Sequence, residues 1–323
     1  MYSIRQLKKY LDEHHHISMK PNQTQQLRNL GYYHGYKGYR FIKNPSHKIA
    51  FTDFDQVIAI NEFDMQLKSL FYPKVMFIET ALKNYVIESV LRESKSENID
   101  TIFNKSLTYY RSFTLGSTNY KSAYTKRMQL KGKINSALLR DYGQKQQIVK
   151  HFFDADKPIP VWAIFESLTL GEFGNFYSCC NLSTKLSASS LLKLPTNLNS
   201  DGKVTESIIY AIKDLRNSVA HNNIIFDTRF KTGSIDNRLS TCLQQETKIS
   251  NVTFNSIEDY IVLIIYILRN MGVTKTECKQ FARSFLTITE TLRSKLPISM
   301  YNQIISTNLR PKMNLLETYI SKS

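Results

Sequence analysis

A helical pattern runs through FDQVIAINEFDMQLKSLFYPKVMFIETALKNYVIESVLR, residues 54–92. Apolar side chains recur there every three or four residues, which is the period of an amphipathic helix. One apolar stripe is formed by Val75, Ile78, Leu82 and Tyr85. Because Pro73 has no amide hydrogen to donate, the pattern predicts two helices, about 54–71 and 73–92, with a break or kink between them.

The rest of the chain shows the same helical period. Its 323 residues include only 11 Gly and 8 Pro, and the alternation typical of strands is scarce. Further helices are predicted over 3–16, 21–30, 120–151, 161–170 (closed by Gly171), 173–190, 204–221, 256–270, 275–295 and 312–321. The turn-rich or polar connections are expected at 31–41, 94–119 and 227–254. We therefore expect an all-α fold, a multi-helix bundle with insertions.

The overall composition favours a nucleic-acid partner. Lys and Arg number 43 against 27 Asp and Glu, a formal charge of +16, and this field attracts polyanions. The N-terminus MYSIRQLKKY lacks the apolar core of a signal peptide, and the longest apolar stretch, 260–268, is far shorter than the ~20 residues of a membrane span. We expect a cytoplasmic protein that has no membrane partner.

The cysteines and a run of histidines do not predict a metal or redox site. Cys179 and Cys180 are adjacent rather than spaced as chelators, and Cys242 and Cys278 stand alone, so buried thiols are expected. The consecutive histidines 14–16 fan out around a helix and cannot all face one ion. No phosphate-binding glycine loop is present, and no cofactor is expected.

Much of the positive charge lies between residues 105 and 150, which hold ten basic residues and one acid. Tyrosines are interleaved with these cations, a combination suited to phosphates and unstacked bases of single-stranded RNA. The expected RNA contacts are Arg111, Lys121, Lys126, Arg127, Lys131, Lys133 and Arg140. A solvated helix face with ordinary core tyrosines is the alternative. The acid-free stretch 20–48 is also rich in Tyr and Gly, and either packing or RNA contact would explain it.

The helix ESIIYAIKDLRNSVAHNN, residues 206–223, carries the candidate chemistry. Asp214, Asn217 and His221 are spaced to share one helix face, and the long side chain of Arg216 can reach the same face. A His can move a proton and an Arg can stabilise charge on phosphorus, so this set suits RNA cleavage by the substrate's own 2′-hydroxyl. A helix-terminal His with a surface Arg is the alternative, because an Arg followed by a His after four to six residues also occurs twice in 28–47.

The segment RNSVAHNNIIFDTR, residues 216–229, resembles the Arg-Asn-x-x-x-His segment of the HEPN superfamily, in particular of the Abi-like (AbiD/AbiF) abortive-infection proteins. Three further segments match that family in order: LRNLGYYHGYKGYRF, FDMQLKSLFYPKVMFIETALKNYV and PVWAIFESLTLGEFGNFY. The resemblance implies a HEPN-type helical core over 51–270 with a basic insertion at about 94–150. An N-terminal segment, 1–50, and a C-terminal helical extension, 271–323, flank that core.

The resemblance also implies an activity. It implies a metal-independent endoribonuclease that cleaves single-stranded RNA, acting in phage defence or as a toxin restrained by a partner such as a non-coding RNA. The implied catalytic residues are Arg216, Asn217 and His221, with Asp214 and Glu79 as possible support, whereas Trp162 and Glu166 are expected to pack. A homodimer with a composite site is the expected form, and a non-catalytic RNA-binding module is the alternative function.

Overall fold

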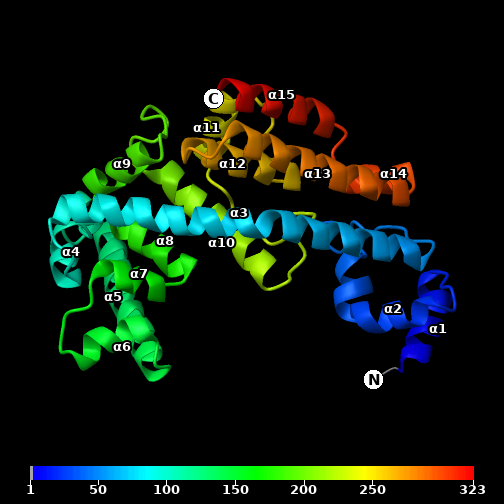
Figure 1. Ribbon diagram of the computed structural model, residues 1–323, viewed down its shortest axis with the longest axis horizontal. Helices are drawn as coiled ribbons and strands as arrows, with labels where there is room; N and C mark the ends of the chain where they lie inside the picture. The colour runs from blue at the N-terminus through cyan, green and yellow to red at the C-terminus, as the bar shows by residue number, and fades with distance from the viewer. Residues whose placement is uncertain (1–2) are drawn as a thin grey trace. The chain divides into compact units, whose positions relative to one another are not determined.

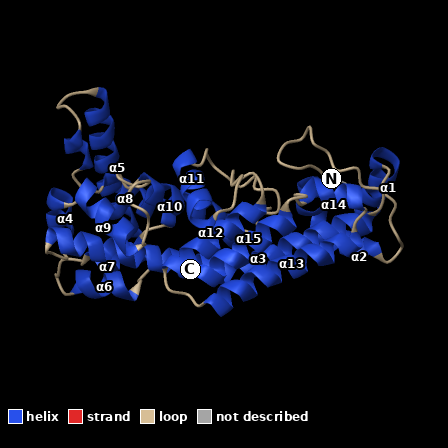
Figure 2. Cartoon of the chain, turned by 90° about the horizontal axis from the view of Figure 1, so that it is seen from above, coloured by secondary structure: helices blue, strands red, loops and turns tan. Residues whose placement is uncertain are grey.

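The computed structural model describes residues 3–323, and α-helix is their dominant secondary structure. These residues form fifteen α-helices, one π-helix and one 3₁₀-helix. Figure 2 shows helices and loops without strands over the described part of the chain, where β-pairing is limited to isolated bridges such as Ser18 with Asp53. The predicted all-α fold is confirmed.

The chain divides into two compact units. Unit 1 comprises Met1–Val75, Asp214–Ser234 and Leu243–Ser323, and unit 2 comprises Met76–Lys213 and Ile235–Cys242. Two long helices, α3 (Phe54–Ser94) and α10 (Lys203–Ala220), therefore contribute residues to both units. The division into 1–50, 51–270 and 271–323 that the sequence suggested stays a prediction.

Unit 1 has its apolar centre at α12, where every residue from Ile257 to Leu268 is buried. Helices α12, α13 and α15 contact one another and lie side by side in Figure 1. An edge-on contact between the rings of Phe71 and Phe281, 5.9 Å between centroids, joins α3 to α13. The elements wholly within this unit are α1 (Ile4–His15), α2 (Gln23–Leu30), the π-helix η1 (Gly31–Lys37), α12 (Ile257–Asn270), α13 (Lys275–Lys295), α14 (Ile298–Ile304) and α15 (Leu309–Lys322).

Unit 2 is arranged around α5 (Thr118–Gly143), the helix that contains most of the basic segment. It contacts α6, α7, α8 and the 3₁₀-helix η2 (Figure 1). The apolar centre includes Phe165, whose ring meets those of Phe173 and Phe176 nearly edge-on. The remaining elements are α4 (Ile99–Lys105), η2 (Tyr109–Ser112), α6 (Gln147–Asp154), α7 (Val161–Ser167), α8 (Leu170–Cys179), α9 (Leu182–Leu191) and the start of α11 (Asn237–Thr247).

The predicted break at Pro73 is wrong, because α3 continues through it as one helix. Proline removes one hydrogen bond, to the carbonyl four residues earlier, which belongs to Ser69. Ser69 and Pro73 are both exposed, so water can satisfy that carbonyl. The apolar stripe on either side of Pro73 keeps its helical phase and stays buried, which outweighs one missing bond.

Other helix boundaries differ from the predicted ones, because short capped helices lie within segments that were read as polar connections. Gly171 does not close a helix; it lies inside α8, which begins at a capping box formed by Thr169 and Glu172. The expected polar connections at 94–119 and 227–254 contain α4 and α11, and α4 starts where the Asn98 side chain accepts from two backbone amides. The expected turn-rich stretch at 31–41 begins with η1, and α14 was not expected.

Candidate functional site

The residues of the Arg-Asn-x-x-x-His segment lie at the C-terminal end of α10. Arg216 and Asn217 are half-buried in its last turn, and His221 is exposed just beyond it. Asn222 ends the helix in the left-handed conformation, with φ of 55°, and the amide of Asn223 donates to the carbonyl of Ser218 at 2.8 Å. This is the geometry in which Asn often replaces Gly after a helix.

Within this turn the side chains of Arg216 and Asn217 are in contact. The Nη1 of Arg216 donates to the Oδ1 of Asn217 at 3.1 Å, so the amide orients the guanidinium. The imidazole of His221 forms no hydrogen bond with the part of the chain that the structure describes, and it faces solvent. One cation and one titratable ring are therefore presented by the same helix end.

The two expected supporting carboxylates have structural partners. Asp214 accepts from both the amide and the hydroxyl of Thr232, at 3.0 and 2.8 Å, and so holds the following loop against α10. Glu79 is buried in unit 2, with its Oε1 3.3 Å from the ammonium of Lys83. Lys83 also donates to the carbonyl of Leu168 at 3.1 Å. Their support of catalysis stays a prediction.

A buried ion pair on α3 anchors the segment that follows His221, and sequence reasoning missed it. Asp64 is fully buried, its Oδ2 is 2.7 Å from the ammonium of Lys68, and its Oδ1 accepts from the amides of Ile225 and Phe226, both at 2.9 Å. Lys68 in turn donates to the Oδ1 of Asn222 at 2.8 Å. The signal available in the sequence was an Asp and a Lys four residues apart on the apolar helix 54–92.

The Tyr/Gly-rich stretch packs against the same segment. Arg229 donates to the carbonyls of Gly38 and Phe41, at 2.8 and 2.6 Å, and its guanidinium lies over the Phe41 ring. A Cβ at Gly38 would lie 2.7 Å from the Cδ1 of Ile224, so this stretch approaches the Ile224 side chain closely. Packing is thus confirmed for the buried Tyr36 and Tyr39, whereas the ring of Tyr33 is 73% exposed.

Three of the seven side chains predicted to contact RNA are bound to other groups of unit 2. Arg127 donates to the carbonyls of Leu107 and Phe103, at 3.0 and 2.9 Å. Arg140 pairs with Asp141 at 2.8 Å and donates to the carbonyl of Ser167 at 3.0 Å. Lys131 pairs with Asp100 at 3.2 Å. Two arginines therefore hold connections in place.

The other four predicted contacts are more available. Lys121 and Lys133 are exposed, and with Lys126 they form no ion pair among residues 3–323. The guanidinium of Arg111 donates to the neighbouring Tyr110 hydroxyl at 3.1 Å. Beside them three tyrosine rings contact one another, with centroid distances of 5.1 to 6.1 Å, namely Tyr110, Tyr120 and Tyr124. This surface, α5 with η2, presents both cations and rings.

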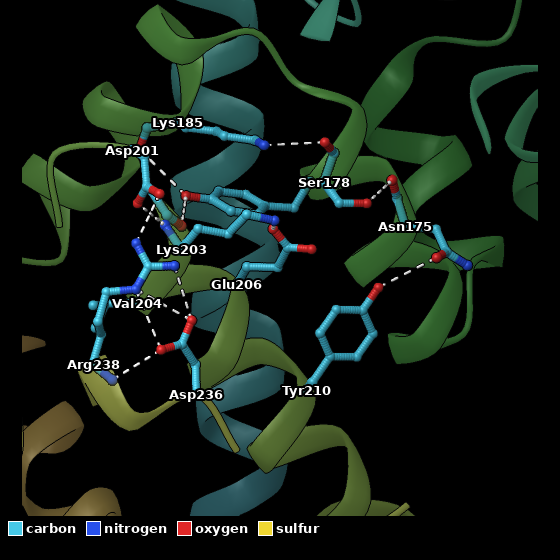
Figure 3. A network of polar contacts seen from close by, with 12 residues as sticks. Asn175, Ser178, Lys185, Asp201, Lys203, Val204, Glu206, Tyr210, Asp236 and Arg238 are labelled. Atoms are coloured by element: carbon cyan, nitrogen blue, oxygen red, sulfur yellow. Dashed lines mark hydrogen bonds and ion pairs between the residues drawn. The ribbon is translucent and has the colours of Figure 1, made fainter. Parts of the chain in front are cut away.

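Two cavities open on this surface. One of about 190 Å³ lies between η2 and α5 on one side and α8 and α10 on the other. A second of about 490 Å³ lies between α5 and Asn175 and is lined by Lys126 and Lys133. Figure 3 shows the polar network at the first cavity's α10 side, where the ammonium of Lys203 lies against the carboxylate of Glu206, 2.8 Å apart.

The remaining predictions concern Trp162, Glu166 and the four cysteines. Trp162 was expected to pack, but the residue is 43% exposed; its Nε1 donates to Glu97 at 3.0 Å and its ring is nearly perpendicular to that of Phe152. Glu166 is exposed. All four cysteines are buried thiols, as predicted.

A protein-family model described as Abi-like protein matches residues 25–227, more than half of the chain. The chain belongs to the Abi-like protein family. This membership suggests a role in abortive infection, a bacterial defence against phage. Neither a curated protein nor a solved structure matches the chain significantly.

The matched range includes the contacts that define the candidate site. It contains the Asp64 and Lys68 pair, the end of α10 and the Tyr/Gly-rich stretch that packs on Ile224. No helix among the described residues is long and apolar enough to cross a membrane.

Proposed function

We propose that this Abi-like chain is a metal-independent endoribonuclease of the HEPN type that cleaves single-stranded RNA during abortive infection. The observation that carries the proposal is the pairing of a half-buried guanidinium with a solvent-exposed imidazole, Arg216 and His221, at one helix end. The turn between them and the next segment is fixed by Asp64 and Lys68, so the pair sits on a rigid support.

The chemistry needs a base, an acid and a cation. His221 removes the proton from a ribose 2′-hydroxyl, the 2′-oxygen forms a bond to phosphorus, and the bond from phosphorus to the 5′-oxygen breaks. Arg216 stabilises the negative charge that gathers on the phosphate oxygens, and Asn217 orients it. The leaving 5′-oxygen takes a proton from a protonated imidazole, and the products are a 2′,3′-cyclic phosphate and a 5′-hydroxyl. The nucleophile belongs to the substrate, so no metal-bound water takes part.

A second copy of the chain completes this site. One imidazole cannot act as base and acid at once, whereas a symmetric dimer brings two Arg and His pairs to the same axis. We therefore propose a homodimer with a composite site. A ribonuclease of this kind harms its host, and we propose that a non-coding RNA bound along the basic surface restrains it until infection.

Cleavage of a single-stranded RNA by the purified chain in EDTA tests this proposal. The wild type should cleave, and Arg216→Ala and His221→Ala should each lose activity by roughly a hundredfold or more. His34→Ala is the matched control, because this histidine is also exposed in unit 1 but lies outside the Arg-Asn-x-x-x-His segment. Undiminished cleavage by the two active-site variants, or cleavage that needs a divalent metal, would contradict the proposal.

A non-catalytic RNA-binding module is the second candidate. The observation that favours it is the surface of α5 and η2, where available lysines lie beside three mutually contacting tyrosines. Such a module would bind RNA with strong salt dependence but leave it intact. In the cleavage assay above, the wild type would then give no products.

A further inference from the structure

The cavity between η2 and α10 in unit 2 has the walls of a site for a flat ring. Tyr109, Tyr110 and Phe113 line one side of it. Tyr109 is fixed from behind by the buried Lys185, whose ammonium lies 3.9 Å from the ring centroid and donates to the carbonyl of Ser178 at 3.0 Å. A ring wall held in this way is ready to stack without further ordering.

The size of the cavity limits its occupant. At about 190 Å³ it is smaller than the ~300–1,000 Å³ that a cofactor or drug-sized ligand occupies. One ring system fits this space, with its substituents in solvent. On its α5 side the cavity is lined by Lys126, which forms no ion pair among residues 3–323, so an anionic substituent is favoured beside the ring.

The floor of the cavity, its α10 side, carries one carboxylate, Glu206, beside the basic Lys203. Glu206 is 9% exposed, and one of its oxygens pairs with the ammonium of Lys203 at 2.8 Å. A carboxylate only accepts hydrogen bonds, so a ligand at this floor must offer donors. A ligand with two adjacent donors on one edge can donate to both oxygens of this carboxylate.

The floor is held by a second layer of ion pairs, which Figure 3 shows around Arg238. Arg238 pairs with Asp201 at 2.8 Å and with Asp236 at 2.9 Å. Asp201 accepts from the amide of Lys203 at 3.0 Å, which fixes the first turn of α10. The position of Glu206 is therefore set before any ligand arrives.

We propose that this cavity binds one unpaired guanine base of an RNA strand, with Glu206 accepting from the Watson–Crick edge and Lys126 holding an adjacent phosphate. Among the four bases, guanine alone presents an imino and an amino donor side by side on that edge. Adenine and cytosine each offer one donor beside an acceptor, and uracil places its single donor between two acceptors. Stacking on the fixed ring of Tyr109 supplies the sequence-tolerant part of the binding.

This inference deepens the proposed function, because it assigns a base preference to the RNA that the chain binds. Binding of 2′-O-methyl oligouridines carrying one central guanine, inosine or adenine tests it. These strands lack the nucleophilic hydroxyl, so the result does not depend on Arg216 or His221. If the chain prefers guanine but cleaves no RNA, the guanine site stands and the ribonuclease proposal is wrong. If the chain cleaves RNA but shows no preference for guanine, the ribonuclease proposal stands and the guanine site is wrong.

The wild type should bind the guanine strand about tenfold more tightly than the adenine strand, with inosine between them because it lacks the amino group. Glu206→Gln should abolish this preference without weakening the adenine strand. Glu166→Gln removes the same charge from an exposed site of unit 2, and this variant should retain the guanine preference. Lys126→Ala should weaken all three strands alike.

Equal binding of guanine and adenine strands by the wild type would overturn the assignment. A guanine preference that survives in Glu206→Gln would overturn it as well. Competition with GMP distinguishes a strand from a free nucleotide, since GMP should compete far more weakly than the guanine strand. GMP that competes equally well would show a nucleotide site and refute the RNA assignment.

Discussion

Lys68 donates a hydrogen bond to the side-chain oxygen of Asn222 across 2.8 Å, so a buried ammonium of α3 holds the residue that follows the candidate catalytic histidine. The same ammonium is neutralised by Asp64 at 2.7 Å. That carboxylate also accepts hydrogen bonds from two backbone amides of the segment after Asn222. The position of His221 is thus tied to a buried charge network rather than to α10 alone.

Removal of one member of this network should be costly. Asp64→Ala leaves the ammonium of Lys68 buried without its carboxylate and frees the amides of Ile225 and Phe226. We expect the free energy of unfolding to fall by about 3–5 kcal/mol, measured by urea denaturation. Ribonuclease activity should fall with it at temperatures where the fold persists.

Two further variants show whether burial is the cause. Asp64→Leu combined with Lys68→Met should recover much of the lost stability, because no charge is then left unpaired. Glu13→Ala removes the exposed partner of Lys9, 3.5 Å away, and should change stability by less than about 1 kcal/mol. Equal losses for the buried and exposed pairs would contradict this account of the network.

Two glycines should respond in opposite directions to alanine. Gly132 lies within α5 with open space around it, so Gly132→Ala should stabilise the chain by about 1 kcal/mol. Gly202 has φ of +75°, and a side chain there would lie 2.7 Å from Lys185 and 2.9 Å from Tyr177. Gly202→Ala should destabilise by roughly 1–3 kcal/mol. Urea denaturation of both variants checks the contrast, and a shift of the same sign in both would refute it.

The thiol of Cys179 should be inert near neutral pH. Burial raises its pKa to about 11, and the cations Lys126, Lys185 and Arg127 oppose this only in part. Because only the thiolate reacts, alkylation by iodoacetamide should be slow at pH 8 and rise with pH towards 11. Ser122 lines the same cavity as Cys179, the one between η2 and α10, but is exposed. The thiol of Ser122→Cys should therefore react at the rate of an ordinary thiol. Equal rates at pH 8 would contradict the shielding.

Lysines that look alike in sequence should differ in RNA binding. Lys121→Ala and Lys133→Ala should each reduce the slope of log affinity against log salt by about 0.7, because each releases one counterion from a single strand. Lys131→Ala removes the same charge, but its ammonium already pairs with Asp100, so its effect should be smaller. Filter binding at several salt concentrations measures all three, and equal slopes would contradict this distinction.

The sequence was sufficient for the helical class because apolar spacing dominates where cores form. It failed at Pro73 because the pattern reports a missing donor but not that Ser69, whose carbonyl loses its partner, is exposed to water. It failed for α11 and α4 because short helices depend on caps and tertiary packing more than on period. The exposure of Trp162 likewise depends on neighbours that composition does not reveal.

For the site, the sequence supplied the residue types and the structure supplied their partners. Arg216 and His221 were found because their spacing matches a family segment. Asp64 and Lys68 were overlooked because their partners are 154 to 162 residues away in the chain. Arg127 was grouped with RNA contacts because a charge count cannot distinguish a free guanidinium from one that holds two carbonyls.

The central claim is that His221 activates a ribose hydroxyl, and a DNA strand with a single ribonucleotide tests it most directly. In EDTA, the wild type should cut this strand only after the ribose and leave a 2′,3′-cyclic phosphate, whereas His221→Ala should leave it intact. Cutting at deoxyribose positions, a 3′-hydroxyl product, or equal cutting by the variant would contradict the account.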